Sequence, residues 1–182
     1  MNSRTGLFFV GAAVAALALG GMPAQAQPPA APPGQRSGAL AMGDRVFIKE
    51  AAEASRFEFD ASQLALKNAA SPKVRDYAAM LLRDHKVADA GLLHLSHVRG
   101  LTPPMMTGVH RKTLNQLTAA HGAGFDRIFL EKVGLQSHRD SIKAFEAATR
   151  DARDAELKSW IDGALPVMRG HLAQAQMLAG KR

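Results

Sequence analysis

Hydrophobic residues recur three and four positions apart along most of the chain from about residue 43 onward. This spacing is typical of amphipathic α-helices, because residues at these intervals share one helical face. It predicts four long helices and one shorter helix (105–121), over about residues 44–68, 72–99, 105–121, 125–149 and 154–178. An alternating run of three residues at 57–59 lies inside the first pattern and does not indicate a strand.

The ends of the predicted helices carry residues that favour helix boundaries. Ser71 precedes Pro72 at the start of the second helix, where serine is a preferred N-cap and proline fits the first turn. Gly100 and the prolines that follow it end this helix. Pro166 lies inside the last helix and should kink it, because proline removes one backbone hydrogen bond.

Four long helices with short or broken connections predict an all-α fold, a four-helix bundle. The shorter helix falls in the long connection between the second and third long helices. A long link between two helical hairpins suits the ferritin-like arrangement, and if this link crosses the bundle lengthwise, helices two and three run parallel.

The first 42 residues do not follow the helical pattern of the rest. Residues 1–26 begin with a positive charge at Arg4, continue with an apolar run and end on small residues, which together indicate a secretory signal peptide. Residues 27–42 are rich in proline and glycine and predict a flexible tether. We therefore expect a bundle domain over 43–180 and an exported protein, periplasmic in a bacterium, with no transmembrane anchor after cleavage near Ala26.

Composition and charge narrow the kinds of partner. The chain contains no cysteine, so disulfides cannot stabilise it in an oxidising compartment. Removal of residues 1–26 leaves 22 basic and 16 acidic residues, a net charge of +6. The basic residues are scattered and aromatic residues are sparse, so no specific nucleic-acid site is expected. The charge favours a weak contact with anionic envelope polymers.

Each long helix carries one titratable side chain on its hydrophobic stripe. These residues are Glu58, His85, His138 and His171, each three, four or seven positions from apolar residues of the same face. An unpaired polar group in an apolar setting costs about 2–7 kcal/mol, so each needs a partner. The four could ligate one divalent metal ion, such as zinc or iron. They could instead form hydrogen-bonded pairs, such as Glu58 with His85, that fix the helix register.

The heights of these residues along the bundle bear on whether they meet. At about 1.5 Å per residue, Glu58, His85 and His138 lie roughly 15–20 Å from the same end of the bundle. His171 lies roughly 10–14 Å from that end, about one turn lower. The first three are therefore expected to be neighbours, and the level of His171 is left open.

Three segments combine motifs that resemble a known family. They are "FEFDASQLALKNAASPKVRDYAAMLLRDHKVADAGLL", "FDRIFLEKVGLQSH" and "LPVMRGHL". The sequence resembles the exported bacterial "domain of unknown function 4142" family, which belongs with the ferritin-like four-helix bundles. The resemblance covers about residues 43–178 and implies this fold and an exported location, but no activity. The motif positions are Glu58, Asp84, His85, Phe125, Asp126, His138, Leu165, Pro166 and His171.

Two aspartates in these motifs are candidates for supporting hydrogen bonds around a metal site. Asp84 points about 100° away from His85 around its helix and suits an outer hydrogen-bond acceptor. Asp126 lies in the first turn of the third long helix, where its charge also suits the helix dipole.

The sequence departs from the pattern of di-iron bundles. Those sites use a glutamate from each of two helices and Glu-x-x-His from the other two. Here Leu82, Leu135 and Met168 stand three residues before the histidines, and none is a carboxylate. Three hypotheses follow: a non-enzymatic exported bundle that binds a divalent metal in an envelope or stress role, a structural or interaction protein with a hydrogen-bonded polar core, and a redox metalloenzyme. The missing carboxylates disfavour the third.

Overall fold

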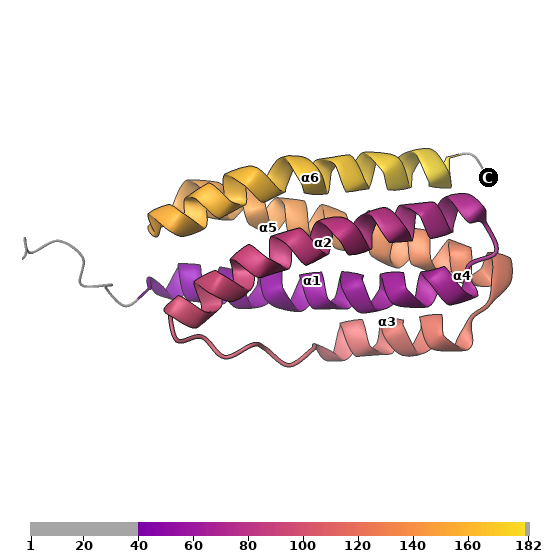
Figure 1. The fold of residues 1–182 in the computed structure, drawn as a ribbon, viewed down its shortest axis with the longest axis horizontal. Coiled ribbons are helices and arrows are strands. Elements are labelled where there is room, and N and C mark those ends of the chain that lie inside the picture. Colours follow the sequence, from indigo (N-terminus) through magenta and orange to yellow (C-terminus); the bar gives the residue numbers. More distant parts are fainter. Residues whose placement is uncertain (1–39, 181–182) are drawn as a thin grey trace, which may run out of the picture. The chain divides into compact units, whose positions relative to one another are not determined.

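A computed structural model describes residues 40–180, which form a bundle of helices without strands (Figure 1). The predicted all-α class is therefore confirmed, whereas the predicted signal peptide and nearly all of the tether lie outside the described residues. The elements are α1 (Met42–Asn68), α2 (Pro72–Val98), α3 (Gly108–Ala119), α4 (Gly122–Ile128), the π-helix η1 (Phe129–Ser137), α5 (His138–Asp151) and α6 (Ala155–Ala179).

Four long rods make up the bundle, and α4, η1 and α5 follow one another without a break to form the third. The end of α1 lies beside the start of this rod, where Ala69 and Gly122 form an isolated bridge. At the opposite end, the backbone N–H of Arg153 donates to the carboxylate of Asp44. The connection between α2 and the third rod therefore runs the length of the bundle, and α2 and the third rod run in the same direction (Figure 1).

The helix α3 lies in this long connection and packs along α1. The carboxylate of Glu53, 8% exposed, accepts from the N–H of Thr107 at 2.8 Å and from His110 Nδ1 at 2.7 Å. The His110 ring stacks on Phe57 with ring centroids 4.1 Å apart. These contacts fix the crossing segment to the outside of α1.

The helix boundaries lie within about three residues of the predicted ones, but the capping at the start of α2 differs. Pro72 begins α2 as expected, but the Ser71 side chain makes no capping hydrogen bond. The carboxylate of Asp126 instead accepts from the N–H groups of Ala70 and Ser71, at 3.1 and 2.9 Å. In the last rod, α6 continues as an α-helix through Pro166.

A polar layer divides the hydrophobic core into two clusters. One cluster contains Phe57, Leu81 and Val133, and the other contains Phe47, Leu92 and Phe145. Glu58, His85, His138 and His171 lie close to the boundary between the two clusters, one on each of the four rods. Packing on both sides therefore holds these four side chains in one layer across the bundle.

The π-helix sets which face of the third rod is buried. From residue 125 to residue 138, buried residues come in adjacent pairs every four positions, at 125–126, 129–130, 133–134 and 137–138. A period of four is longer than the 3.6 residues of an α-turn. A wider turn keeps every pair facing the core, so Phe129 and Leu130 are buried. Ile128 and Leu135, seven residues apart and on one face of a regular α-helix, are half-buried instead.

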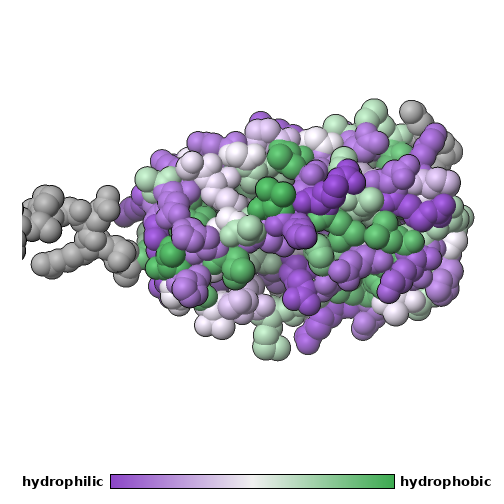
Figure 2. Space-filling model, in the orientation of Figure 1, coloured by the Kyte–Doolittle hydropathy of each residue, from purple (hydrophilic) through white to green (hydrophobic). Residues whose placement is uncertain are grey.

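The outer surface is mixed in character. Figure 2 shows polar residues over most of one face of the bundle, with hydrophobic residues gathered near its middle. Within residues 40–180, no helix has both the length and the apolar character needed to span a lipid bilayer.

Gly134 permits a close approach between η1 and α6, and we predict that Gly134→Ala destabilises the bundle. An added β-carbon there would lie 2.9 Å from Cβ of Ala175. We expect the free energy of unfolding to fall by about 1–3 kcal/mol, the usual cost of overpacking. Gly170→Ala is the matched control on α6, because open space surrounds that position, and it should raise stability by up to about 1 kcal/mol. Urea unfolding followed by circular dichroism measures both; equal effects would contradict the close packing.

Candidate metal centre

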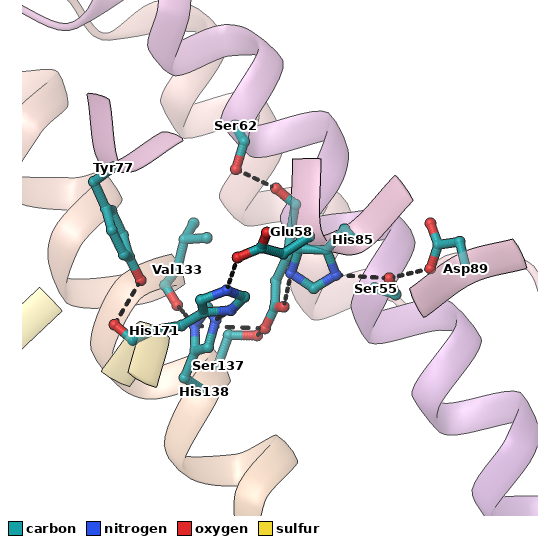
Figure 3. A network of polar contacts seen from close by, with 11 residues as sticks. Ser55, Glu58, Ser62, Tyr77, His85, Asp89, Val133, Ser137, His138 and His171 are labelled. Carbon is teal, nitrogen blue, oxygen red and sulfur yellow. Dashed lines mark hydrogen bonds and ion pairs between the residues drawn. The ribbon is translucent and has the colours of Figure 1, made fainter. Parts of the chain in front are cut away.

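The polar layer brings four ligand-type side chains together from four rods. Glu58 comes from α1, His85 from α2, His138 from the start of α5 and His171 from α6 (Figure 3). Their exposed fractions are 0%, 5%, 0% and 3%. The expected neighbours are therefore adjacent, and His171 is level with them.

Three of the four side chains turn a ring nitrogen toward a common space, and Glu58 lies beside His85. His85 Nε2 lies 2.9 Å from Glu58 Oε2, and His138 Nε2 lies 3.3 Å from His171 Nδ1. One nitrogen from each of the three histidines lies within 4.8 Å of the corresponding nitrogens of the other two. The layer therefore contains a compact set of three imidazoles and one carboxylate.

Outer hydrogen bonds set the tautomers of His138 and His171. His138 Nδ1 lies 2.9 Å from the carbonyl oxygen of Val133, which can only accept, so Nδ1 carries the hydrogen. His171 Nε2 lies 2.9 Å from the Asp84 carboxylate and donates to it for the same reason. When both rings are neutral, the two remaining nitrogens, His138 Nε2 and His171 Nδ1, therefore face each other with lone pairs.

His85 is held in the same way by a two-step relay. The Ser55 hydroxyl donates to the carboxylate of Asp89, so its oxygen accepts from His85 Nδ1 at 2.9 Å. His85 Nε2 is left facing Glu58 Oε2. Although these atoms are only 2.9 Å apart, their orientation is not that of a hydrogen bond, and neither has another partner among residues 40–180.

The electrostatics of the layer favour an ionised glutamate. Burial raises the pKa of Glu58, but His138, His85 and the Ser137 hydroxyl, which donates to Oε1 at 2.6 Å, together lower it to about 2. Burial lowers the pKa of His85, yet the neighbouring Glu58 carboxylate raises it above the ordinary value overall. Burial also lowers the pKa of His171, more than Asp84 offsets. Without a metal, the layer therefore resembles an imidazolium–carboxylate pair beside a neutral imidazole.

This donor set fits a divalent transition-metal ion. Imidazole nitrogen and carboxylate oxygen are ordinary ligands of zinc, iron and copper. In a tetrahedral zinc site with Zn–N bonds of about 2.0–2.1 Å, neighbouring donors lie roughly 3.3 Å apart. That is the separation of His138 Nε2 and His171 Nδ1. Each imidazole also has its outer nitrogen hydrogen-bonded to an acceptor, the arrangement usual for metal-bound histidines.

The two predicted supporting aspartates have different positions. Asp84 lies beside the layer and fixes the tautomer of His171. Asp126 does not: both its carboxylate oxygens are engaged at the turn between α1 and α2. Ala70, which it contacts, lies 12 residues beyond Glu58, about 18 Å along a helix. The prediction that Asp126 supports the metal site was therefore wrong, because its carboxylate binds backbone N–H groups at this turn.

Four further residues hold the layer and were not singled out from the sequence. They are Ser55, Asp89, Val133 and Ser137. Ser55 lies three residues before Glu58 and Asp89 four after His85, so helical spacing could have suggested both. Val133 contributes its backbone carbonyl, which every residue type has, so the sequence gives no sign of this contact.

The fold and site define an all-α helical bundle with a buried cluster of histidines. The chain belongs to the family described as "Domain of unknown function (DUF4142)", whose model matches residues 29–178. No curated protein matches the chain significantly.

Two solved structures share the fold. The first is a DUF305 fragment from Deinococcus radiodurans, with a TM-score of 0.69 and 14% identity, covering 79% of this chain and 99% of that one. The second is CopM in the Cu(II)-bound form, with a TM-score of 0.63 and 17% identity, covering 76% of this chain and 97% of that one. At these identities, the likeness establishes the helical fold alone.

We predict that Asp84→Asn weakens metal binding without unfolding the protein. The introduced side-chain amide can rotate and donate to His171 Nε2, which places a hydrogen on the inward Nδ1. Loss of such an outer partner typically costs about 10–100-fold in metal affinity. The measurement is a Zn²⁺ titration against a competing chelator, with the exposed Asp162→Asn as control. An Asp84→Asn affinity within twofold of the control would show that the outer aspartate does not orient His171.

Proposed function

We propose that this protein binds one divalent transition-metal ion through Glu58, His85, His138 and His171. The observation that carries the proposal is the 3.3 Å approach of His138 Nε2 and His171 Nδ1 in a buried layer, with an acceptor on the outer side of both rings. When both rings are neutral, their lone pairs therefore face each other. Two electron-rich atoms at this distance repel each other unless a cation lies between them. Glu58 supplies a negative charge beside them, which a cation also neutralises.

Zinc and iron are the first candidates for the ion. Three imidazoles and one carboxylate suit both, and no thiolate is available because the chain lacks cysteine. Copper is a second candidate, favoured by the shared fold of CopM in its Cu(II)-bound form. Divalent copper also binds nitrogen and oxygen sites more tightly than zinc does. Competition between the ions for the purified protein decides among them.

The proposed role is non-enzymatic metal binding by an exported, ferritin-like bundle in an envelope or stress setting. A single long connection between the second and third rods supports the ferritin-like assignment. A redox di-iron enzyme is less well supported, because the layer offers one carboxylate from the four rods and Leu82, Leu135 and Met168 occupy the positions of the others.

A hydrogen-bonded polar core is the alternative, favoured by the 2.9 Å approach of His85 and Glu58. In that case a proton shared by His138 and His171 replaces the ion. Replacing a buried ion pair with well-packed hydrophobic residues is often neutral or stabilising. The alternative predicts that Glu58→Leu, which fills the site, costs less stability than Glu58→Ala, with no metal to lose in either variant. The metal proposal predicts that both variants lose metal.

We predict that His85→Ala abolishes stoichiometric metal binding. The full chain, produced without a histidine tag and stripped with a chelator, should take up one equivalent of Zn²⁺, whereas His85→Ala should take up none. Because a ligand bound by the folded state alone stabilises it, Zn²⁺ at 100 times Kd should add about 2.7 kcal/mol. For a domain of this size, that raises Tm by roughly 5–10 °C.

The matched control is His97→Ala, because His97 is an exposed histidine on the same helix. It should keep one equivalent of Zn²⁺ and the full rise in Tm. No Zn²⁺ uptake by the unaltered chain would overturn the metal proposal, and full uptake by His85→Ala would remove His85 from the ligand set.

We also propose that the protein is exported and that its positive charge attracts anionic envelope polymers weakly. The first 26 residues and the net charge of +6 without them support this. The processed chain should bind a heparin column at low salt and elute as salt screens the charges. Its appearance in the flow-through at low salt would contradict the attraction.

A further inference from the structure

A cavity of about 470 Å³ reaches the metal centre from one side. Glu58, His85 and His171 form part of its lining, whereas His138 does not. Most of the remaining lining is apolar and comes from four helices, including Ala51, Leu92, Phe145, Trp160, Ala164 and Met168. The donor set therefore has one face against packed protein and one face against open space.

The cavity opens to solvent between α2 and α6. Val87 of α2 and Val167 of α6 both line it and are 77% and 45% exposed. Small residues keep the space between these helices open. At Gly163, an added β-carbon would meet no atom within 4 Å. Gly91 instead lets the Trp160 ring pack against α2, because an added β-carbon there would lie 2.9 Å from the ring. Trp160 is fixed in the wall by a hydrogen bond from Nε1 to the carbonyl of Ala88, 3.2 Å long.

These features are those of a small-molecule pocket. Such pockets have volumes of about 300–1,000 Å³, mainly apolar walls and a few convergent polar groups. Structural zinc sites have four protein ligands, whereas sites that take an outside ligand keep a coordination position open or expand to five ligands. With Glu58 and three histidines bound, an outside donor here would be a fifth ligand. The open side here faces a cavity large enough for an aromatic ring.

The charges at the inner end select the kind of ligand. Glu58 and Asp84 both line this end, so an anionic head group would approach two carboxylates. A cationic head group would approach the bound ion. An uncharged electron-pair donor avoids both repulsions, and the apolar walls favour an uncharged body as well.

We propose that the cavity binds a small uncharged molecule with an apolar body and a nitrogen or hydroxyl donor at one end, directed at the metal centre. This inference rests on the proposed metal binding and adds the class of ligand. The body lies against the Trp160 and Phe145 side of the cavity, and the donor end lies at His85 and His171.

The test compares imidazole with 4-phenylimidazole on the Zn²⁺-loaded full chain at about pH 8, where both probes are mainly uncharged. Trp160 is the single tryptophan of the chain and lines the cavity, so its fluorescence reports binding. Burial of the phenyl ring should make 4-phenylimidazole bind about 10–100-fold more tightly than imidazole. Benzoate should bind more weakly than 4-phenylimidazole, and removal of Zn²⁺ should weaken 4-phenylimidazole binding at least about tenfold.

Filling the cavity provides the structural control. Gly163→Leu should reduce the advantage of the phenyl group to less than about threefold. Gly170→Leu is the matched variant on the same helix, outside the cavity lining, and should keep the full advantage. Ala88→Leu fills the cavity from the facing helix α2 and replaces Gly163→Leu if that variant does not fold.

The outcomes separate this inference from the metal proposal. If the unaltered chain binds one equivalent of Zn²⁺ but shows no preference for the phenyl group, this inference alone fails. It also fails if the preference survives in the filled variants, if benzoate binds more tightly, or if Zn²⁺ makes no difference. If the unaltered chain binds no Zn²⁺, both proposals fail.

Discussion

Two imidazole nitrogens, His138 Nε2 and His171 Nδ1, lie 3.3 Å apart in the interior of this bundle, and hydrogen bonds on the outer side of each ring favour a lone pair on both when the rings are neutral. The Val133 carbonyl and the Asp84 carboxylate take the hydrogens of His138 and His171 on the outer sides. Since neither outer partner can donate, a neutral ring cannot turn its hydrogen inward without losing its outer hydrogen bond. A cation between the two nitrogens would remove their repulsion, and the two proposed functions differ in whether this cation is a proton or a metal ion.

The helical packing and the polar layer depend on each other. Hydrophobic clusters above and below the layer fix the heights of the four rods, so the ligand atoms meet without any loop contributing to them. The dependence between helical packing and the polar layer is clearest at the π-helix η1. It presents adjacent residues to the core, so Ser137 and His138 both lie against Glu58, at 2.6 and 3.8 Å. π-Helical segments occur often at functional sites, and this one shapes the third rod around a carboxylate.

Sequence periodicity was sufficient for the parts of the structure that depend on one helix at a time. The helical class, the approximate ends of the rods and the inward direction of Glu58, His85 and His138 all follow from the spacing of apolar residues. The period of four between residues 125 and 138 is present in the sequence, but the prediction used the 3.6-residue repeat of a regular α-helix. The level of His171 depended on how far α6 is shifted along its neighbours, which no single-helix pattern contains.

Contacts between rods were the hardest to predict. Asp126 and Asp84 are both aspartates beside motif residues, yet one binds backbone at a turn and the other orients a histidine. What separates them is which neighbouring rod each faces, and this depends on rotations of whole helices. The cavity beside the polar layer also depends on how whole helices are rotated, because small residues on α2 and α6 leave space only when they face each other.

The most direct test of the opposed lone pairs is a long-range ¹H–¹⁵N correlation spectrum of the histidine side chains, recorded with one equivalent of Zn²⁺. It reports which ring nitrogens carry hydrogen. The account predicts no hydrogen on His85 Nε2, His138 Nε2 or His171 Nδ1, with hydrogens retained on the three outer nitrogens. A hydrogen on any of these inward nitrogens in the Zn²⁺-saturated protein would contradict it.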